Sequence, residues 1–275
     1  MRPLAARLAR PERSVTACSL REKPASAGFS LIIAPVLVAA ARSVLTYIVV
    51  SLYVLIVAPV GMLVALLTGW SGHLYVLGHI GVRVGLALCG IRYRIDAAQA
   101  LPLDRPAVYC ANHQSNVDPP VLFAALHPRM HILYKAELDR IPVLARAFRM
   151  GGFIPIERRN REAALRSIDA GARSIRAGNS FLIFPEGTRS QTDELLPFKK
   201  GGFVMAMKAQ APIVPVAIRG GRSAMRKGSA VIRPATIRVR VGTPIETVGL
   251  APADRNLLIE RVRQQIAAML AEPQA

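Results

Sequence analysis

The chain has 275 residues, 52% of them hydrophobic, and a formal net charge of +19. This length and hydrophobic content allow one large domain with a sizeable core or two small ones. The positive charge indicates an anionic partner, but the sequence has no ribonucleoprotein aromatic motif, helix-turn-helix spacing or zinc-finger pattern, so we expect no nucleic acid among its partners.

Residues 1–28 are predicted to form a basic, disordered arm, and residues 29–82 a membrane-anchoring segment. No Asp, Glu, Lys or Arg occurs between residues 43 and 82, and about 20 apolar residues are enough to cross the hydrocarbon layer of a membrane. A cleaved signal peptide is the less favoured alternative, because the apolar segment is longer than the core of such a signal. A membrane surface with anionic headgroups is therefore the first partner that the charge predicts.

The geometry of the anchoring segment stays open at this point. Pro59 and Gly61 lie inside it, where they can kink a single span or divide it. The apolar stretches 29–41 and 45–67 therefore form either one span or a helical hairpin. Both flanks are basic, so a hairpin with both flanks in the cytoplasm satisfies the positive-inside rule most simply, and we expect a membrane protein whose site faces the cytoplasm.

Residues 83–275 are predicted to form one α/β domain, in which short apolar strands alternate with amphipathic helices. The expected strands are residues 91–96, 107–111, 131–136, 153–157, 181–184, 213–218 and 235–242. The expected helices are residues 78–90, the segment after Asp118, and residues 141–150, 161–178, 202–209 and 254–271. This alternation predicts a mostly parallel sheet flanked by helices.

Three polar clusters follow predicted strands: NHQSNVD (112–118), ERRNR (157–161) and PEGTRS (185–190). In open α/β sheets, residues that handle ligands gather in the loops beyond the carboxyl ends of the strands. We therefore expect the three clusters to meet in one site.

His113 and Asp118 are the candidate catalytic pair. If Asp118 accepts a hydrogen bond from one ring nitrogen of His113, the other nitrogen can take a proton from a hydroxyl group that attacks an electrophile. Asp118 precedes Pro119 and Pro120, so it is also a good helix N-cap. The two interpretations are compatible, since one carboxylate oxygen can serve the backbone and the other the imidazole.

A cationic ligand site is predicted around the third cluster. A glycine lets a ligand approach the backbone, and arginine and threonine donate hydrogen bonds to an anionic oxygen. A guanidinium group suits a phosphate well, although a polar turn with solvated charges has the same composition. The residues concerned are Glu186, Gly187, Thr188 and Arg189, with Arg158 of the second cluster and with Lys199 and Lys200 further along.

Other chemistries fit the sequence less well. It contains no Gly-x-Ser-x-Gly elbow, Walker loop or His-Glu-x-x-His pattern. Cys110 lies near His113, but a cysteine on an apolar strand is more often part of the core than a nucleophile. The three cysteines lack the spacing of metal ligands, which indicates a reducing compartment or buried thiols.

The chain resembles the glycerolipid (lysophospholipid) acyltransferase family, and in particular its 1-acyl-glycerol-3-phosphate acyltransferases. The resemblance covers roughly residues 85–245 and depends on four blocks in the order of the family. These are NHQSNVD (112–118), GGFIPIERR (151–159), FPEGTRS (184–190) and APIVPVAI (211–218).

The resemblance implies roles for individual residues. His113 matches the catalytic histidine of the family, Asp118 its partner, and Arg158 the arginine of the second motif. The positions that contact the substrate fall on Glu186, Gly187, Thr188 and Arg189.

The implied reaction moves an acyl group from acyl-CoA or acyl carrier protein to the free sn-2 hydroxyl of 1-acyl-glycerol-3-phosphate, giving phosphatidate, with no metal or organic cofactor. His113 would deprotonate that hydroxyl, and the thiolate would leave without a covalent enzyme intermediate. Two alternatives stay open. One is acylation of another lysolipid, such as a lysophospholipid or a lyso-ornithine lipid, and the other is a membrane protein that binds lipid without catalysis.

Overall fold

The computed structural model describes residues 25–97, 100–126, 129–157 and 160–272. The chain divides into two compact units, residues 1–37 and residues 38–275. The second unit contains every strand and every helix described, apart from the beginning of the first helix. The arm predicted over residues 1–28 lies outside the described residues up to residue 24, so its disorder stays a prediction.

The anchoring segment forms two long helices, α1 (Ala25–Thr68) and α2 (Gly72–Cys89). Pro59 and Gly61 do not interrupt α1, so the two apolar stretches within it form one continuous helix and not a hairpin. The helical hairpin is made with α2 instead, which begins at Gly72 and not at residue 78 as predicted. α2 runs through the predicted domain boundary at residue 82.

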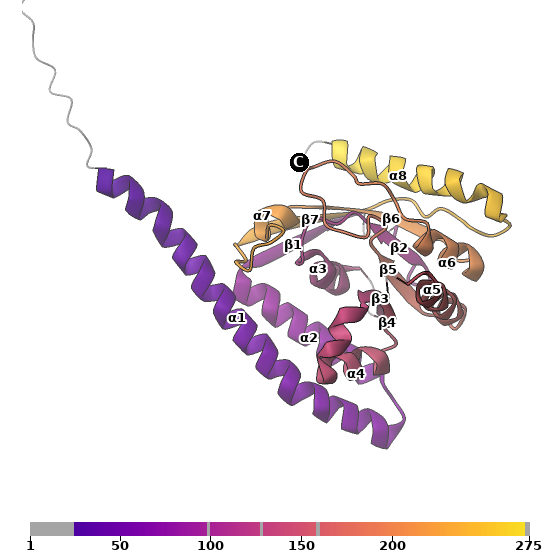
Figure 1. Cartoon of the computed structure of the whole chain (residues 1–275), viewed down its shortest axis with the longest axis horizontal. Coiled ribbons are helices and arrows are strands. Elements are labelled where there is room, and N and C mark those ends of the chain that lie inside the picture. The colour runs from indigo at the N-terminus through magenta and orange to yellow at the C-terminus, as the bar shows by residue number, and fades with distance from the viewer. Residues whose placement is uncertain (1–24, 98–99, 127–128, 158–159, 273–275) are drawn as a thin grey trace, which may run out of the picture. The chain divides into compact units, whose positions relative to one another are not determined.

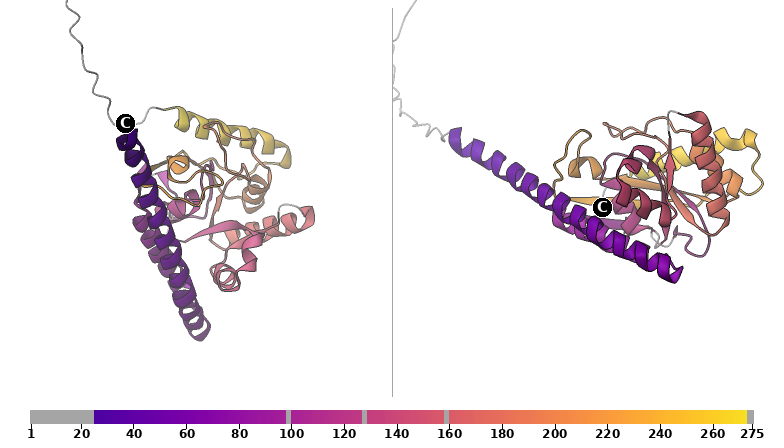
Figure 2. Two further views of the ribbon diagram at one scale, coloured as in Figure 1. Left: turned by 60° about the vertical axis from the view of Figure 1, so that its left-hand side comes forward. Right: turned by 60° about the horizontal axis from the view of Figure 1, so that its bottom comes forward.

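In the second unit, α2 lies antiparallel to the later part of α1 (Figure 2). The Tyr53 hydroxyl donates to the Leu77 carbonyl at 2.8 Å, and Arg42 Nε donates to the Leu88 carbonyl at 3.1 Å. By length and composition, both helices are able to cross a membrane. Their exposed apolar side chains include Leu45, Leu52, Leu55, Leu63, Leu66 and Leu67.

The centre of the second unit is a seven-stranded sheet with the order β1-β7-β6-β2-β5-β3-β4 (Figure 1). Every neighbouring pair is parallel except β6 and β7. The strands are β1 (Ile91–Asp96), β2 (Val108–Ala111), β3 (Met130–Lys135), β4 (Ile154–Ile156), β5 (Ser180–Ile183), β6 (Ile213–Arg219) and β7 (Ala235–Val241). The predicted mostly parallel sheet is confirmed, and each strand lies within two residues of its predicted bounds.

Helices cover both faces of this sheet. They are α3 (Asp118–Ala125), α4 (Pro142–Met150), α5 (Arg161–Arg176), α6 (Gly201–Ala209), α7 (Gly221–Ala224) and α8 (Arg255–Ala271), with 3-10 turns η2 (Ala136–Arg140) and η3 (Pro252–Asp254). The fold class predicted from the sequence, an α/β sheet flanked by helices and preceded by an apolar helix, is therefore confirmed.

Strand β2 shows how the two faces are built. All of its residues are buried, as expected for a central parallel strand. Tyr109 and Ala111 join the core cluster that contains residues of α2 and α3. Val108 and Cys110 join the other cluster, with residues of α5, α6 and α8. Because side chains alternate along a strand, β2 is anchored in both cores, and the loop that follows it starts from a rigid point.

Candidate active site

His113 and Asp118 meet in the loop between β2 and α3. His113 Nδ1 lies 3.0 Å from Asp118 Oδ2. The same oxygen accepts backbone N–H bonds from Gln114 at 2.6 Å and from Ser115 at 2.7 Å. The Asp118 side chain is fully buried, whereas that of His113 keeps 16% of its surface exposed. A carboxylate held in this way fixes the orientation of the imidazole, and it leaves Nε2 as the nitrogen that can face a substrate.

The position of Asp118 differs from the predicted helix cap. Val117 occupies the N-cap position without a side-chain cap bond, and Asp118 is the first residue of α3. The predicted division of labour between the two carboxylate oxygens is also wrong. Oδ2 takes all three hydrogen bonds, and Oδ1 is buried with no hydrogen-bond partner in the part of the chain that the structure describes.

Gly221, the first residue of α7, lies against this second oxygen. A Cβ atom added to Gly221 would be 2.1 Å from Asp118 Oδ1 and 3.1 Å from Ser115 Cβ. No larger residue fits without moving the carboxylate, so Gly221 helps to define the position of Asp118. The sequence analysis did not single out this residue, and the only available signal was a pair of glycines soon after a predicted strand.

Glu186 connects the third polar cluster to the backbone of His113. Its Oε1 accepts the His113 N–H at 2.8 Å, and its Oε2 accepts the Leu196 N–H at 3.0 Å. Ser190 N–H in turn donates to the His113 carbonyl at 2.8 Å. Burial raises the pKa of the Glu186 carboxyl, and the two N–H donors oppose that rise. Hydrogen bonds on both sides of His113 thus join the β2–α3 loop to the loop after β5.

The imidazole also has an aromatic neighbour. The ring of Phe184 stacks on the ring of His113, with 4.2 Å between the centroids and 29° between the planes. The ring of His113 is therefore fixed by a hydrogen bond at one edge and by a packed face.

Cationic side chains surround the segment Gly187–Arg189. Gly187 has a φ angle of +68°, and a Cβ there would lie 2.8 Å from Lys199 Nζ, so the lysine side chain crosses directly over the glycine. Lys227 Nζ lies 3.2 Å from the Arg189 carbonyl and 3.4 Å from Thr188 Oγ1. The structure thus brings Lys199 to the predicted cluster and adds Lys227, which the sequence analysis missed. Arg158 lies outside the described residues, and its position stays a prediction.

The fourth block, on β6, is also joined to the His113 loop. The side-chain amide of Asn112 donates to the Ile218 carbonyl at 3.0 Å, and Asn112 Oδ1 accepts the Ile218 N–H at 2.7 Å. The Ser115 hydroxyl donates to the Met225 carbonyl at 2.8 Å. Three of the four sequence blocks therefore meet around His113 through hydrogen bonds between described residues.

The chain is similar to known proteins of one family. Residues 92–219 match the family model described as Acyltransferase. The 1-acyl-sn-glycerol-3-phosphate acyltransferase of Limnanthes douglasii is 34% identical over 194 residues, which cover 68% of each chain. The chain belongs to the acyltransferase family. This confirms the resemblance indicated by the four blocks and the enzyme class that it implied.

Other relatives of this chain are also 1-acyl-sn-glycerol-3-phosphate acyltransferases by name. The coconut (Cocos nucifera) 1-acyl-sn-glycerol-3-phosphate acyltransferase is 33% identical over 205 residues, which cover 74% of this chain and 65% of that protein. The human beta enzyme of that name is 34% identical over 172 residues, 62% of each chain. The matched part is thus about two thirds of the length of these relatives.

A solved structure shows a similar fold. The crystal structure of the 1-acyl-sn-glycerophosphate acyltransferase from Thermotoga maritima superposes with a TM-score of 0.73 at 21% identity, covering 86% of this chain and 98% of that chain. At this identity, the match supports the fold of the acyltransferase and no finer statement.

An apolar cavity of about 350 Å³ lies in the second unit of the acyltransferase, between α1, α2, α3 and α4. Its wall includes Tyr53, Leu74, Phe123 and Phe148, and it reaches Pro119 and Pro120 beside Asp118. We call it the larger cavity. Its apolar lining suits a hydrocarbon chain, and the cavity ends beside the loop that carries His113.

Two alternative chemistries find no support in the described residues. Cys110 is completely buried, and this burial raises the pKa of its thiol, so the acyltransferase does not present it as a thiolate nucleophile. No three His, Cys, Asp or Glu side chains among the residues described gather in a way that could hold a metal ion.

Proposed function

We propose that the protein transfers an acyl group from acyl-CoA or acyl carrier protein to the sn-2 hydroxyl of 1-acyl-glycerol-3-phosphate, giving phosphatidate. The observation that carries the proposal is the buried Asp118 that holds the His113 ring at 3.0 Å, next to a loop surrounded by cationic side chains. The names of the curated relatives support the same substrate.

His113 acts as the general base in this proposal. Its Nε2 takes the proton of the glycerol hydroxyl as the oxygen attacks the thioester carbonyl. The new C–O bond forms, the C–S bond breaks, and the thiolate leaves and is protonated. Asp118 stabilises the imidazolium ion that forms during the attack. General-base catalysis of this kind contributes roughly 10²- to 10⁴-fold to the rate.

The phosphate of the acceptor binds to the segment Gly187–Arg189 in this proposal, with Arg158 as a further ligand. Arg189 and the neighbouring lysines supply positive charge, Thr188 supplies a hydroxyl donor, and Gly187 leaves room for the Lys199 side chain to reach this segment. Glu186 was expected at the substrate too. Since both of its oxygens accept backbone N–H bonds, we assign it the task of holding the two loops together.

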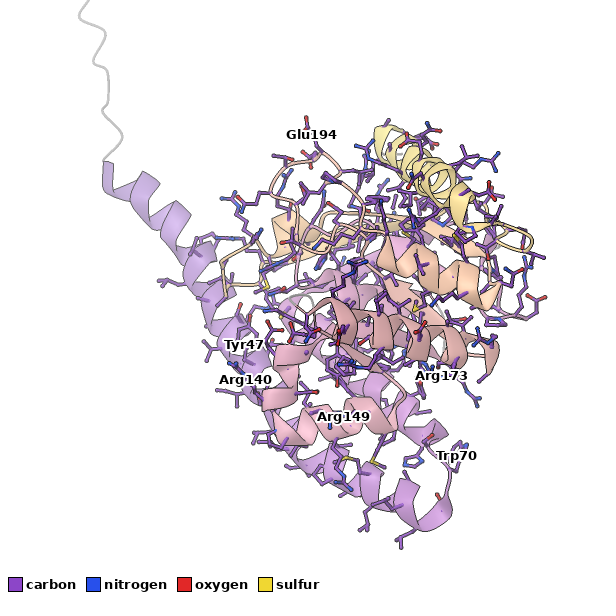
Figure 3. All side chains as sticks on the ribbon, turned by 45° about the vertical axis from the view of Figure 1, so that its right-hand side comes forward. Tyr47, Trp70, Arg140, Arg149, Arg173 and Glu194 are labelled. Atoms are coloured by element: carbon purple, nitrogen blue, oxygen red, sulfur yellow. The ribbon has the colours of Figure 1, made fainter. Side chains whose placement is uncertain are left out.

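We also propose that α1 and α2 attach the enzyme to a membrane, with the catalytic domain on the cytoplasmic side. Their exposed apolar side chains support this, as does Trp70, which lies in the turn between the two helices with 58% of its surface exposed (Figure 3). Tryptophan favours the boundary between headgroups and hydrocarbon. The larger cavity, between these helices and the domain, then takes the acyl chain of the donor.

One assay tests the proposed function. Purified protein in detergent is given radiolabelled long-chain acyl-CoA, or the acyl carrier protein thioester, with a panel of acceptors. The panel consists of lysophosphatidate, a lysophospholipid with a larger headgroup, and a lyso-ornithine lipid. We expect labelled phosphatidate as the main product. A main product from another acceptor would show that the protein acylates that lysolipid instead. No product from any acceptor would support lipid binding without catalysis.

A further inference from the structure

A second apolar cavity, of about 260 Å³, shares part of its wall with the larger one. Val50 of α1, Val82 of α2 and Pro120 of α3 line both cavities. The rest of the wall of this smaller cavity comes from α1, α2, the loop after His113 and the segment that follows α7, and includes Tyr47, Leu86, Asn116, Val117, Met225 and Ile232.

The polar groups in the wall of the smaller cavity are largely engaged. The Thr46 hydroxyl donates to the Arg42 carbonyl at 2.8 Å and lies 3.3 Å from the Cys89 thiol. The Tyr47 hydroxyl donates to the Ala230 carbonyl at 2.7 Å. A ligand in this cavity therefore gains from burying hydrocarbon and finds few free polar partners, which is the environment that an acyl chain needs.

One short segment connects the smaller cavity to the cationic loop. Met225 and Ile232 line the cavity, while Lys227 between them reaches Thr188 and Arg189. This segment, residues 225–232, is also fixed at both ends. The Met225 carbonyl accepts the Ser115 hydroxyl, and the Ile232 N–H donates to Ser43 Oγ at 2.8 Å. A cation and an apolar wall are thus held a few residues apart on a segment that is tied to the His113 loop.

The larger cavity has different neighbours. Its wall includes α4 and the two prolines after Asp118, and no residue of the segment 225–232 lines it. The two proposed substrates also differ in whether a phosphate lies close to the hydrocarbon chain. The lysolipid acceptor carries a phosphate and a chain on one glycerol, whereas the donor's acyl chain is joined through its thioester to a long carrier.

We propose that the smaller cavity binds the acyl chain of the lysolipid acceptor, while its phosphate binds to Arg189 and Lys227. This inference rests on the proposed function. The glycerol of the acceptor then lies between the segment 225–232 and the His113 loop, and the donor chain in the larger cavity approaches the same histidine from the other side of Pro120. The two chains never share a cavity, so the enzyme can select acceptor and donor chain lengths independently.

The test fills each cavity in turn. Ile232→Phe puts a larger side chain into the smaller cavity and reduces its free volume. Ala147→Leu is the matched variant in the larger cavity, since Ala147 lines only that one of the two. For each purified variant, kcat/KM is measured with lysophosphatidates of several chain lengths and one donor, and then with acyl-CoAs of several chain lengths and one acceptor. A single methylene group in an apolar pocket changes kcat/KM by about 10-fold or more.

We expect Ile232→Phe to lower the ratio of long-chain to short-chain acceptor kcat/KM by about 10-fold and to leave the donor profile unchanged. Ala147→Leu should lower the ratio of long-chain to short-chain donor kcat/KM and leave the acceptor profile unchanged. Ile232→Ala, which enlarges the smaller cavity, should raise the same acceptor ratio, so it keeps the test valid if the phenylalanine variant does not fold.

Two results would overturn the inference. In one, the Ile232 variants shift the donor profile and Ala147→Leu shifts the acceptor profile. In the other, neither acceptor profile nor donor profile responds to the Ile232 variants, in which case a bilayer lipid and not the substrate fills the cavity. Failure of the proposed function is distinguishable, because the wild-type protein would then give no phosphatidate at all.

Discussion

Two buried carboxylates lie on either side of His113, and they do different things. Asp118, the first residue of α3, bonds to the imidazole ring and to two backbone N–H groups of the β2–α3 loop. Glu186, in the loop after β5, bonds to the backbone N–H of His113 and to that of Leu196. One carboxylate thus contacts the imidazole that we propose as the base, and the other contacts the backbone that carries it. The comparison teaches that burial and negative charge do not by themselves identify a catalytic acid or base, because the bonded atom decides the role.

Among the changes that keep His113, the largest effect is expected from Asp118→Asn. The amide can no longer stabilise an imidazolium ion, and it can favour the wrong tautomer of His113, so we expect kcat to fall by roughly 10³- to 10⁴-fold, as for the aspartate of serine protease triads. Steady-state acyl transfer to lysophosphatidate measures this. The matched control is Asp104→Asn, an exposed aspartate, which should keep wild-type turnover. Turnover near the wild-type value in Asp118→Asn would remove the distinction between the two carboxylates.

The second largest effect is expected from Gly221→Ala, which displaces the Asp118 carboxylate without changing its chemistry. In Gly221→Ala, the new methyl group would start 2.1 Å from Asp118 Oδ1, so the carboxylate or α7 must move. A displacement of about 1 Å at a catalytic group can cost about 10²-fold in rate, and we expect a loss of kcat of that order with a small change in KM. Ser223→Ala, on the exposed side of α7, is the control. An unchanged kcat in a stably folded Gly221→Ala protein would show that the position of Asp118 tolerates this movement.

Glu186→Gln should have a smaller effect on turnover and a larger one on stability. A glutamine amide can accept only one of the two N–H bonds, so one buried donor loses its partner, at a cost of about 1–3 kcal/mol in the free energy of unfolding. Urea unfolding measures it. The matched control is Glu194→Gln, in the same loop and exposed to solvent (Figure 3). Equal stability of the two variants would contradict the role given to Glu186.

The stability difference between the wild type and Glu186→Gln should also depend on pH. Burial raises the pKa of the Glu186 carboxyl group above its ordinary value of 4.5. The folded chain therefore binds a proton at this carboxyl group more tightly than the unfolded chain does. The Glu186 contribution to stability is therefore fully present below that ordinary value and is lost as the pH rises through the raised value. The free energy of unfolding of the wild type, relative to that of Glu186→Gln, should fall as the pH rises from the ordinary pKa of the carboxyl group to the raised one. A relative stability that rises with pH would contradict the direction of the shift.

The smallest effect is expected at the outer side of the cationic loop. Lys227→Ala removes an exposed charge whose amine contacts Thr188 and Arg189, and we expect KM for lysophosphatidate to rise by about 10-fold or less with kcat nearly unchanged. Arg261→Ala on α8 removes the same charge from an exposed position on another helix. Equal effects of the two variants would mean that Lys227 acts only through net charge.

Much of the fold was predictable because the relevant signals are local. Alternating and continuous apolar runs located all seven strands, and the strand and helix alternation gave the parallel sheet. The antiparallel β7 was not predictable, since its direction depends on the path of the chain after β6. The continuity of α1 was missed because a helix that is apolar on every side has no periodic pattern, and Pro59 suggested a break that packing against α2 does not require.

At the candidate site, the sequence predicted several of the side chains that lie around His113, but not which atoms they contact. The spacing of His113 and Asp118 suggested their contact, and the structure has it. The fit of Gly221 against Asp118 Oδ1 and the approach of Lys227 to Thr188 both depend on residues about 40 to 100 positions apart in the chain. Such contacts leave no mark in local composition, so only the folded chain reveals them.

The central claim is that the His113 imidazole, oriented by Asp118, removes the proton of the acceptor hydroxyl. The most direct measurement is the turnover of His113→Ala with labelled acyl-CoA and lysophosphatidate, made on protein whose unfolding midpoint matches that of the wild type. We expect a loss of kcat at least as large as that of Asp118→Asn, at least about 10³-fold. A variant that still forms phosphatidate within a few-fold of the wild-type rate would contradict it.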